Sequence, residues 1–156
     1  EEPFMKIPVA VITDSDVRDY EKNGDDYVKR DTNTVQLEEQ QKIADINGKA
    51  EQIVKYFAAS KWTLEYSLFK STSLTTVFQN AVKAVHTGTD WNTDFEKELA
   101  RKLINKGLKK TEIAYQIANA IDEDLSKPLR TIQIAVDDDA DSVNYLVKAI
   151  KYAAGN

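Results

Sequence analysis

The chain has 156 residues, of which 42% are hydrophobic and 30% are charged, and it contains few glycines and prolines. This composition predicts one globular domain with its own core and excludes a disordered tract. It has no cysteine, which excludes disulfides and thiolate metal sites and fits a reducing compartment. The net charge of −5 excludes a strongly basic nucleic-acid coat protein, but not an enzyme that acts on nucleic acid.

The sequence was searched for a membrane span and for a secretory leader. We find no apolar stretch long enough to span a membrane and no secretory leader, so we expect a cytoplasmic protein without a membrane partner. The chain begins Glu1-Glu2-Pro3, and its single methionine is at position 5. This beginning indicates a piece of a longer protein.

The first predicted element is a strand over the apolar run 8–13. An unbroken apolar run is typical of a strand buried on both faces of a parallel sheet. Asp14 and Asp16 follow it directly, and ligands in α/β sheets bind beyond the carboxyl ends of the strands. Carboxylate oxygens there suit a hard cation such as Mg²⁺. Because Asp and Ser also start turns after strands, the pair by itself leaves both interpretations open.

A polar segment and a helix come next. Residues 17–34 are rich in charge and contain Asn23-Gly24-Asp25-Asp26, which predicts an exposed, irregular loop. The helix formers of residues 37–46 predict a helix that Gly48 ends.

The second predicted strand leads into another helix. Residues 53–59 are rich in β-branched and aromatic side chains and predict a strand. Leu64 and Leu68 recur at helical spacing behind it, with Thr63 as the N-cap.

The rest of the chain is predicted to be mainly helical. One helix follows Leu74, a capping box at Thr93-Asp94-Phe95-Glu96 starts another that ends before Gly107, and further helices lie near 113–121 and 141–155. Two strands and about six helices indicate an α/β domain.

The predicted parallel sheet is unusually small. We expect its remaining strands upstream of Glu1, or in residues 132–136, whose apolar and polar side chains alternate.

Three polar motifs lie at element junctions. Asp14 and Asp16 follow the first strand, and Glu65 comes to the same sheet edge if the two strands are parallel. Lys110 stands where a helix begins, which opposes the helix dipole but suits phosphate binding together with the free N–H groups. A solvated lysine is the ordinary alternative.

In this order, the motifs Val11-Ile12-Thr13-Asp14-Ser15-Asp16, Thr63-Leu64-Glu65-Tyr66 and Lys110-Thr111-Glu112-Ile113-Ala114 resemble a known family. They look like the C-terminal Toprim region of the OLD-family (overcoming lysogenization defect) ATP-dependent endonucleases, and Tyr145–Ile150 is similar to the end of that region. The resemblance implies a Toprim-like parallel sheet flanked by helices, over residues 1–73 and 108–156, with an inserted helical subdomain at 74–107.

The resemblance also implies a function and partners. It implies metal-dependent hydrolysis of DNA phosphodiester bonds, an upstream ATPase domain that alone binds ATP, and a homodimer. Asp14 and Asp16 would be metal ligands, Glu65 would bind the second of two Mg²⁺ or Mn²⁺ ions with Thr63 beside it, and Lys110 would contact the scissile phosphate. The two-metal mechanism activates a water and stabilises the leaving oxygen.

One element of the family pattern is missing. The family places an acidic strand before the two aspartates, and Glu1 and Glu2 have no strand ahead of them, so they are not assigned that role. We therefore expect the N-terminal strand of the sheet to be missing from this chain, the first metal site to lack ligands, and the fragment to be inactive as an endonuclease without that strand.

Two other interpretations stay open. A phosphatase of the haloacid dehalogenase type also starts from Asp-x-Asp, and Asp137–Asp139 would supply its acidic cluster, although Arg18 stands where that family has Thr or Val. A helix-rich regulatory or dimerisation fragment would use its acids only as turns and caps.

Several further residues have both a functional and an ordinary interpretation. Trp62 and Trp91 would stack on bases or pack in the core. Lys102, Lys106, Lys109 and Lys110 would contact a DNA backbone or form an ordinary charged helix surface. His86 is the only histidine, so zinc sites built from histidines and Ser-His-Asp triads lack the residues they need. We expect His86 to end its helix.

Overall fold

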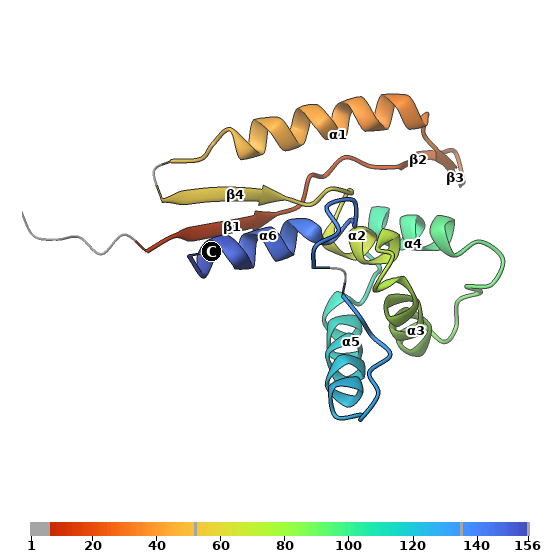
Figure 1. The fold of residues 1–156 in the computed structure, drawn as a ribbon. Helices are drawn as coiled ribbons and strands as arrows, with labels where there is room; N and C mark the ends of the chain where they lie inside the picture. Colours follow the sequence, from red (N-terminus) through yellow and green to blue (C-terminus); the bar gives the residue numbers. More distant parts are fainter. Residues whose placement is uncertain (1–6, 52, 135, 156) are drawn as a thin grey trace, which may run out of the picture.

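The computed structural model describes residues 7–51, 53–134 and 136–155. It confirms an α/β architecture. Strands β1 (Val9–Thr13) and β4 (Val54–Ala58) form a parallel pair in which Val9 lies opposite Val54 and Thr13 opposite Ala58. Helices α1 (Thr32–Asn47) and α6 (Asn144–Ala153) pack on the two faces of this sheet (Figure 1).

The prediction that β1 is buried on both faces is wrong for this chain. Val9 and Ile12 are 43% and 49% exposed. In the part of the chain that the structure describes, β4 is the only neighbour of β1, so the sheet is too narrow to be covered fully.

The third strand predicted over 132–136 is also wrong within the described residues. Residues 132–134 and 136 have no strand pairing, and Ala135 lies outside the described residues. The backbone N–H groups of Thr131 and Ile132 instead donate to the Asp124 carboxylate, at 3.0 and 2.8 Å.

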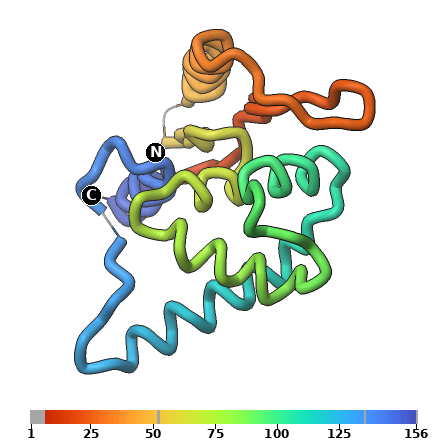
Figure 2. The backbone as a smooth tube through the Cα atoms, turned by 90° about the vertical axis from the view of Figure 1, so that its right-hand side faces the viewer, coloured from red at the N-terminus to blue at the C-terminus, as the bar shows by residue number. Residues whose placement is uncertain are grey.

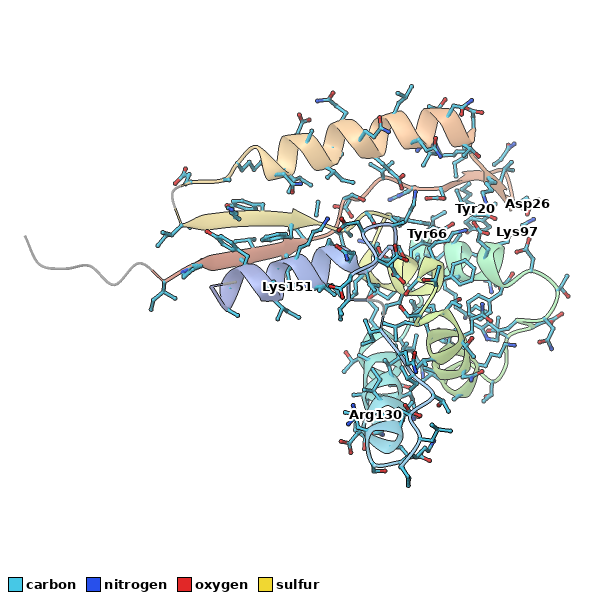
Figure 3. The ribbon with its side chains drawn as sticks, viewed as in Figure 1. Tyr20, Asp26, Tyr66, Lys97, Arg130 and Lys151 are labelled. Atoms are coloured by element: carbon cyan, nitrogen blue, oxygen red, sulfur yellow. The ribbon has the colours of Figure 1, made fainter. Side chains whose placement is uncertain are left out.

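The segment predicted as an irregular loop is a β-hairpin. Strands β2 (Tyr20–Asn23) and β3 (Asp26–Lys29) pair antiparallel, and Gly24, at φ +61°, begins the two-residue connection. Tyr20 and Tyr27 are buried against the helices, and Asp26 pairs with Lys97 at 2.7 Å (Figure 3). The turn signal present in the sequence was Gly24-Asp25, a two-residue connection with glycine at its first position.

Four helices form a lobe beyond the carboxyl edge of the sheet (Figures 1 and 2). They are α2 (Leu64–Lys70), α3 (Thr75–Val85), α4 (Phe95–Ile104) and α5 (Lys110–Leu125). The main apolar core lies here rather than at the sheet. Its largest fully buried apolar side chains are Tyr66, Phe78, Leu99 and Ile113.

Three helix starts differ from prediction. Helix α1 begins at Thr32 because the Asp31 carboxylate accepts from Thr34 N–H at 2.9 Å. Asp94, not Thr93, caps α4, with its carboxylate accepting from Lys97 N–H at 3.0 Å. Helix α6 begins at Asn144 rather than near Asp141. In the described residues, we find no helix with the length and apolarity needed to cross a bilayer.

The cap of α4 can be tested directly. We expect Asp94→Ala to lower the free energy of unfolding by about 1 kcal/mol, because an N–H of the first turn loses its acceptor. Thr93→Ala should cost less, since its hydroxyl donates only to the exposed Asp90. Urea denaturation of both variants measures this difference, and an equal loss would contradict the assignment of Asp94 as the cap.

Candidate functional site

The loops after β1 and β4 are tied together at the carboxyl edge of the sheet. Asp16 N–H donates to Trp62 O at 2.9 Å, and the Ser15 hydroxyl donates to the same oxygen at 3.3 Å. The Asp14 carboxylate accepts from Leu64 N–H, at the first turn of α2, at 2.9 Å. The parallel pairing of the strands therefore places Asp14 next to the start of α2.

The start of α2 brings an acid and a lysine to the same place. Thr63 caps the helix, its hydroxyl accepting from Tyr66 N–H at 3.3 Å. Glu65 lies in the first turn with its side chain 13% exposed, and it pairs with Lys110 Nζ at 2.9 Å. Lys110 is the first residue of α5, so a helix distant in sequence supplies the cation.

The surroundings of Asp14 raise the pKa of its carboxyl group. Burial is the main cause that raises its pKa above the ordinary value, and the negative charges of Glu65 and Asp16 raise it further. The hydrogen bond from Leu64 N–H and the positive charge of Lys110 lower it. The three carboxylates and Lys110 therefore interact electrostatically.

A cavity of about 510 Å³ opens beside these groups. Its lining residues are Asp14, Asp16, Arg18, Trp62, Thr63, Lys102, Leu103, Lys106, Leu108 and Lys110. Four of them are cationic and two are acidic, although the whole chain carries a net charge of −5. The cavity therefore suits an anionic ligand.

Backbone strain gathers at the same cavity. Among the described residues, the non-glycine residues with positive φ are Asp16 at +59°, Trp62 at +24° and Lys106 at +54°. All three line this cavity. Residues with such backbone conformations cluster at functional sites, where the surrounding structure holds them in place.

The donor set fits a hard divalent cation by its chemistry. Asp14, Asp16 and Glu65 supply carboxylate oxygens, the ligands that Mg²⁺ and Mn²⁺ prefer. Within the residues that the structure describes, no three acidic or histidine side chains converge as a ready metal site. Lys110 holds the Glu65 carboxylate, and the Thr63 hydroxyl caps its helix.

The other predicted groups lie elsewhere. Asp137 and Asp139 pair with Lys151 and Lys148 of α6, at 3.4 and 2.9 Å, and do not line the cavity of Asp14. Figure 3 shows Lys151 on α6, beside the sheet.

The two tryptophans are packed in the core. Trp62 and Trp91 are each 4% exposed, and Trp91 Nε1 donates to His86 O at 3.0 Å. The packing interpretation of both rings is therefore correct. His86 ends α3, as predicted.

Sequence reasoning missed Arg18 as a cavity residue. The sequence signal for Arg18 was a cation two residues beyond Asp16, in the loop that follows the first strand.

Comparisons of the chain with family models, curated proteins and solved structures found no match.

Proposed function

We propose that this cavity hydrolyses phosphodiester bonds of DNA with the help of a divalent cation, as a Toprim-like nuclease site. The observation that carries the proposal is the position of Lys110. This lysine reaches from α5 to the strand-end acids, pairing with Glu65 at 2.9 Å beside Asp14. Carboxylates for a metal and a fixed cation for a phosphate are what such a hydrolysis requires.

Each residue has a defined role in this proposal. Asp14, Asp16 and Glu65 would hold Mg²⁺ or Mn²⁺, which supplies an activated water and neutralises phosphate charge. Lys110 would donate to a non-bridging phosphate oxygen and stabilise the negative charge that develops there. Thr63 fixes the first turn of α2 and so positions Glu65.

The ordered motifs support an assignment to the OLD family. On this proposal the chain is the C-terminal part of an ATP-dependent endonuclease in the cytoplasm, with helices α3 and α4 as the inserted subdomain. An upstream ATPase domain and a second copy of the chain would be its partners.

The two alternatives have less support. The phosphatase would need Asp137–Asp139 in the cavity of Asp14, but neither Asp137 nor Asp139 lines that cavity. A purely regulatory domain would not require strained cationic and acidic residues to share one cavity. Release of inorganic phosphate from a phosphomonoester, without cleavage of DNA, would favour the phosphatase.

Metal binding by calorimetry is the first test. We expect the unaltered chain to bind Mn²⁺ or Mg²⁺, and we expect Asp14→Asn and Glu65→Gln each to weaken binding at least about ten-fold, because each removes a charged ligand. Asp25→Asn, in the exposed hairpin turn, is the matched control and should bind as the unaltered chain does. Equal affinities in all variants, or no binding by the unaltered chain, would contradict the proposal.

Cleavage of plasmid DNA, by the protein with the upstream acidic strand restored, tests the role of Lys110. We expect Lys110→Ala to lower the turnover about 10²- to 10³-fold, as removal of a transition-state donor does. Binding of Mn²⁺ should persist, because Lys110 is not a metal ligand. Lys109→Ala is the neighbouring control. Equal rates for the two variants would show that Lys110 has no such role.

A further inference from the structure

Of the nine described lysines and arginines without an ion pair, five lie around the carboxyl edge of the sheet, and the other four are Lys49, Lys55, Lys83 and Arg130. Elsewhere in the described residues most lysines and arginines pair with acids, as Lys97 does with Asp26 at 2.7 Å. Around the sheet edge, five cations have no ion pair within the described residues: Arg18, Lys22, Lys42, Lys102 and Lys106. Unpaired surface cations concentrated in one region attract an anionic partner.

These cations line two cavities that meet. Beside the cavity of Asp14 lies a second one of about 390 Å³, and the two share Asp16 and Arg18. The second cavity is lined by the loop after β1, by the hairpin strand β2, and by Arg30, Glu38, Lys42 and Ile104. Arg18 therefore stands at the junction of one continuous surface.

The second cavity has a fixed wall. Arg30 donates to Arg18 O at 2.9 Å and pairs with Glu38 of α1 at 2.8 Å. These contacts tie the loop after β1 to α1. Lys42 lies one turn further along α1 from Glu38, so the helix presents it to the same cavity.

Lys106 lines the first cavity with a strained backbone, which lowers the stability of the fold. It follows α4 with φ at +54°, a left-handed conformation that favours glycine, and Gly107 comes only after it. A lysine there costs stability compared with glycine. Its exposed side chain lines the cavity without an ion pair, which is what a phosphate-binding lysine requires.

We infer that a single nucleic-acid backbone crosses both cavities. Its phosphates would contact Lys102 and Lys106 in the first cavity, Arg18 at the junction, and Lys22 and Lys42 in the second. This inference rests on the proposed function and extends it. The substrate is a polymer held by several successive phosphates, rather than a small phosphate ester that the first cavity alone would bind.

Binding of labelled duplex DNA in the presence of EDTA tests this path without catalysis. We measure fluorescence anisotropy at several salt concentrations. Lys106→Gly and Lys42→Ala, one in each cavity, should each weaken binding about 3- to 10-fold and lower the slope of log affinity against log salt by about 0.9. Lys106→Gly should also unfold at the same or a higher temperature, because glycine relieves the left-handed strain.

Two controls lie outside the path. Lys49 follows the end of α1, and Arg130 lies near the far end of α5 (Figure 3); neither lines the two cavities. Lys49→Ala and Arg130→Ala should bind DNA as the unaltered chain does. Equal losses in all four variants would indicate nonspecific attraction and overturn the path. If Lys106→Gly lowers the DNA affinity and Lys42→Ala does not, the second cavity is not part of the path.

The path and the nuclease proposal fail separately. DNA binding that depends on both cavities, but without metal-dependent cleavage, would sink the nuclease and leave the path. Cleavage by a chain whose DNA affinity is unaffected by Lys106→Gly and Lys42→Ala would sink the path and leave the nuclease.

Discussion

Replacing Asp141 with alanine is expected to lower the free energy of unfolding by about 3–5 kcal/mol, the largest effect of any single change considered. Asp141 is 4% exposed. One of its oxygens accepts from the hydroxyls of Ser71, Thr72 and Ser73 at 3.0, 2.8 and 2.9 Å, and the other accepts from Val143 N–H at 3.0 Å. Alanine would leave these donors without the carboxylate and remove this link between the α2–α3 turn and the start of α6.

The same carboxylate makes stability depend on pH. Burial raises the pKa of Asp141, but the hydrogen bonds from Val143 N–H and the hydroxyls of Thr72 and Ser71 outweigh it and hold the pKa at about 2, below the ordinary 3.8. Its contribution, on the order of 2 kcal/mol, is fully present above about pH 4 and is lost as the pH falls through about 2.

Urea denaturation at pH 7 and at decreasing pH measures both effects. The difference in the free energy of unfolding between the unaltered chain and Asp141→Ala should shrink below pH 4, because a protonated carboxyl group accepts these hydrogen bonds less strongly than a carboxylate does. Asp139→Ala is the control. Its side chain is 82% exposed and pairs with Lys148 at the surface, so its loss should stay under about 1 kcal/mol. An equally small loss for Asp141→Ala would show that this cluster does not hold the fold.

Glu96→Gln is expected to have the second largest effect, about 2–3 kcal/mol. Glu96 joins three elements. Its Oε1 lies 2.9 Å from Nζ of Lys29 in the hairpin, 2.9 Å from Nζ of Lys70 in α2, and accepts from the hydroxyl of the fully buried Tyr66 at 2.7 Å. A neutral amide keeps the shape but removes the charge that holds both lysines.

The pH dependence has the same sign as for Asp141. Burial raises the pKa of Glu96, but hydrogen bonds from Lys29, Tyr66 and Lys70 outweigh it and lower the pKa from 4.5 to about 2. The stabilising charge is therefore present above about pH 4.5 and is lost toward pH 2. Thermal unfolding between pH 7 and 3 should show the two proteins converging. Glu98→Gln, which breaks only the surface pair with Arg101, should cost under about 1 kcal/mol. A constant difference across this pH range would contradict the charge-based account.

The helices and strands were predictable where local chemistry alone decides them. The apolar runs of β1 and β4, the Thr63 cap of α2 and the Gly48 end of α1 all follow from nearest neighbours in the sequence. The hairpin was not predicted because most of its residues are charged and exposed. Its two buried residues, Tyr20 and Tyr27, are buried by helices that are distant in sequence. Residues 132–134 alternate like a strand, but Asp124 holds the preceding backbone N–H groups.

The candidate site, too, was determined in part by the sequence and in part by the tertiary structure. The sequence by itself determined which residues follow the strands and begin the helices, because turns, caps and apolar runs are local: Asp14, Asp16, Thr63, Glu65 and Lys110 were all identified there. Only the tertiary structure decided that Lys110 pairs with Glu65, 45 residues away, and that Arg18, Lys102 and Lys106 line one cavity with Asp14, Asp16 and Lys110. That convergence depends on the parallel pairing of β1 with β4 and on how the helical lobe packs, and such long-range contacts are set by the whole fold rather than by any local pattern.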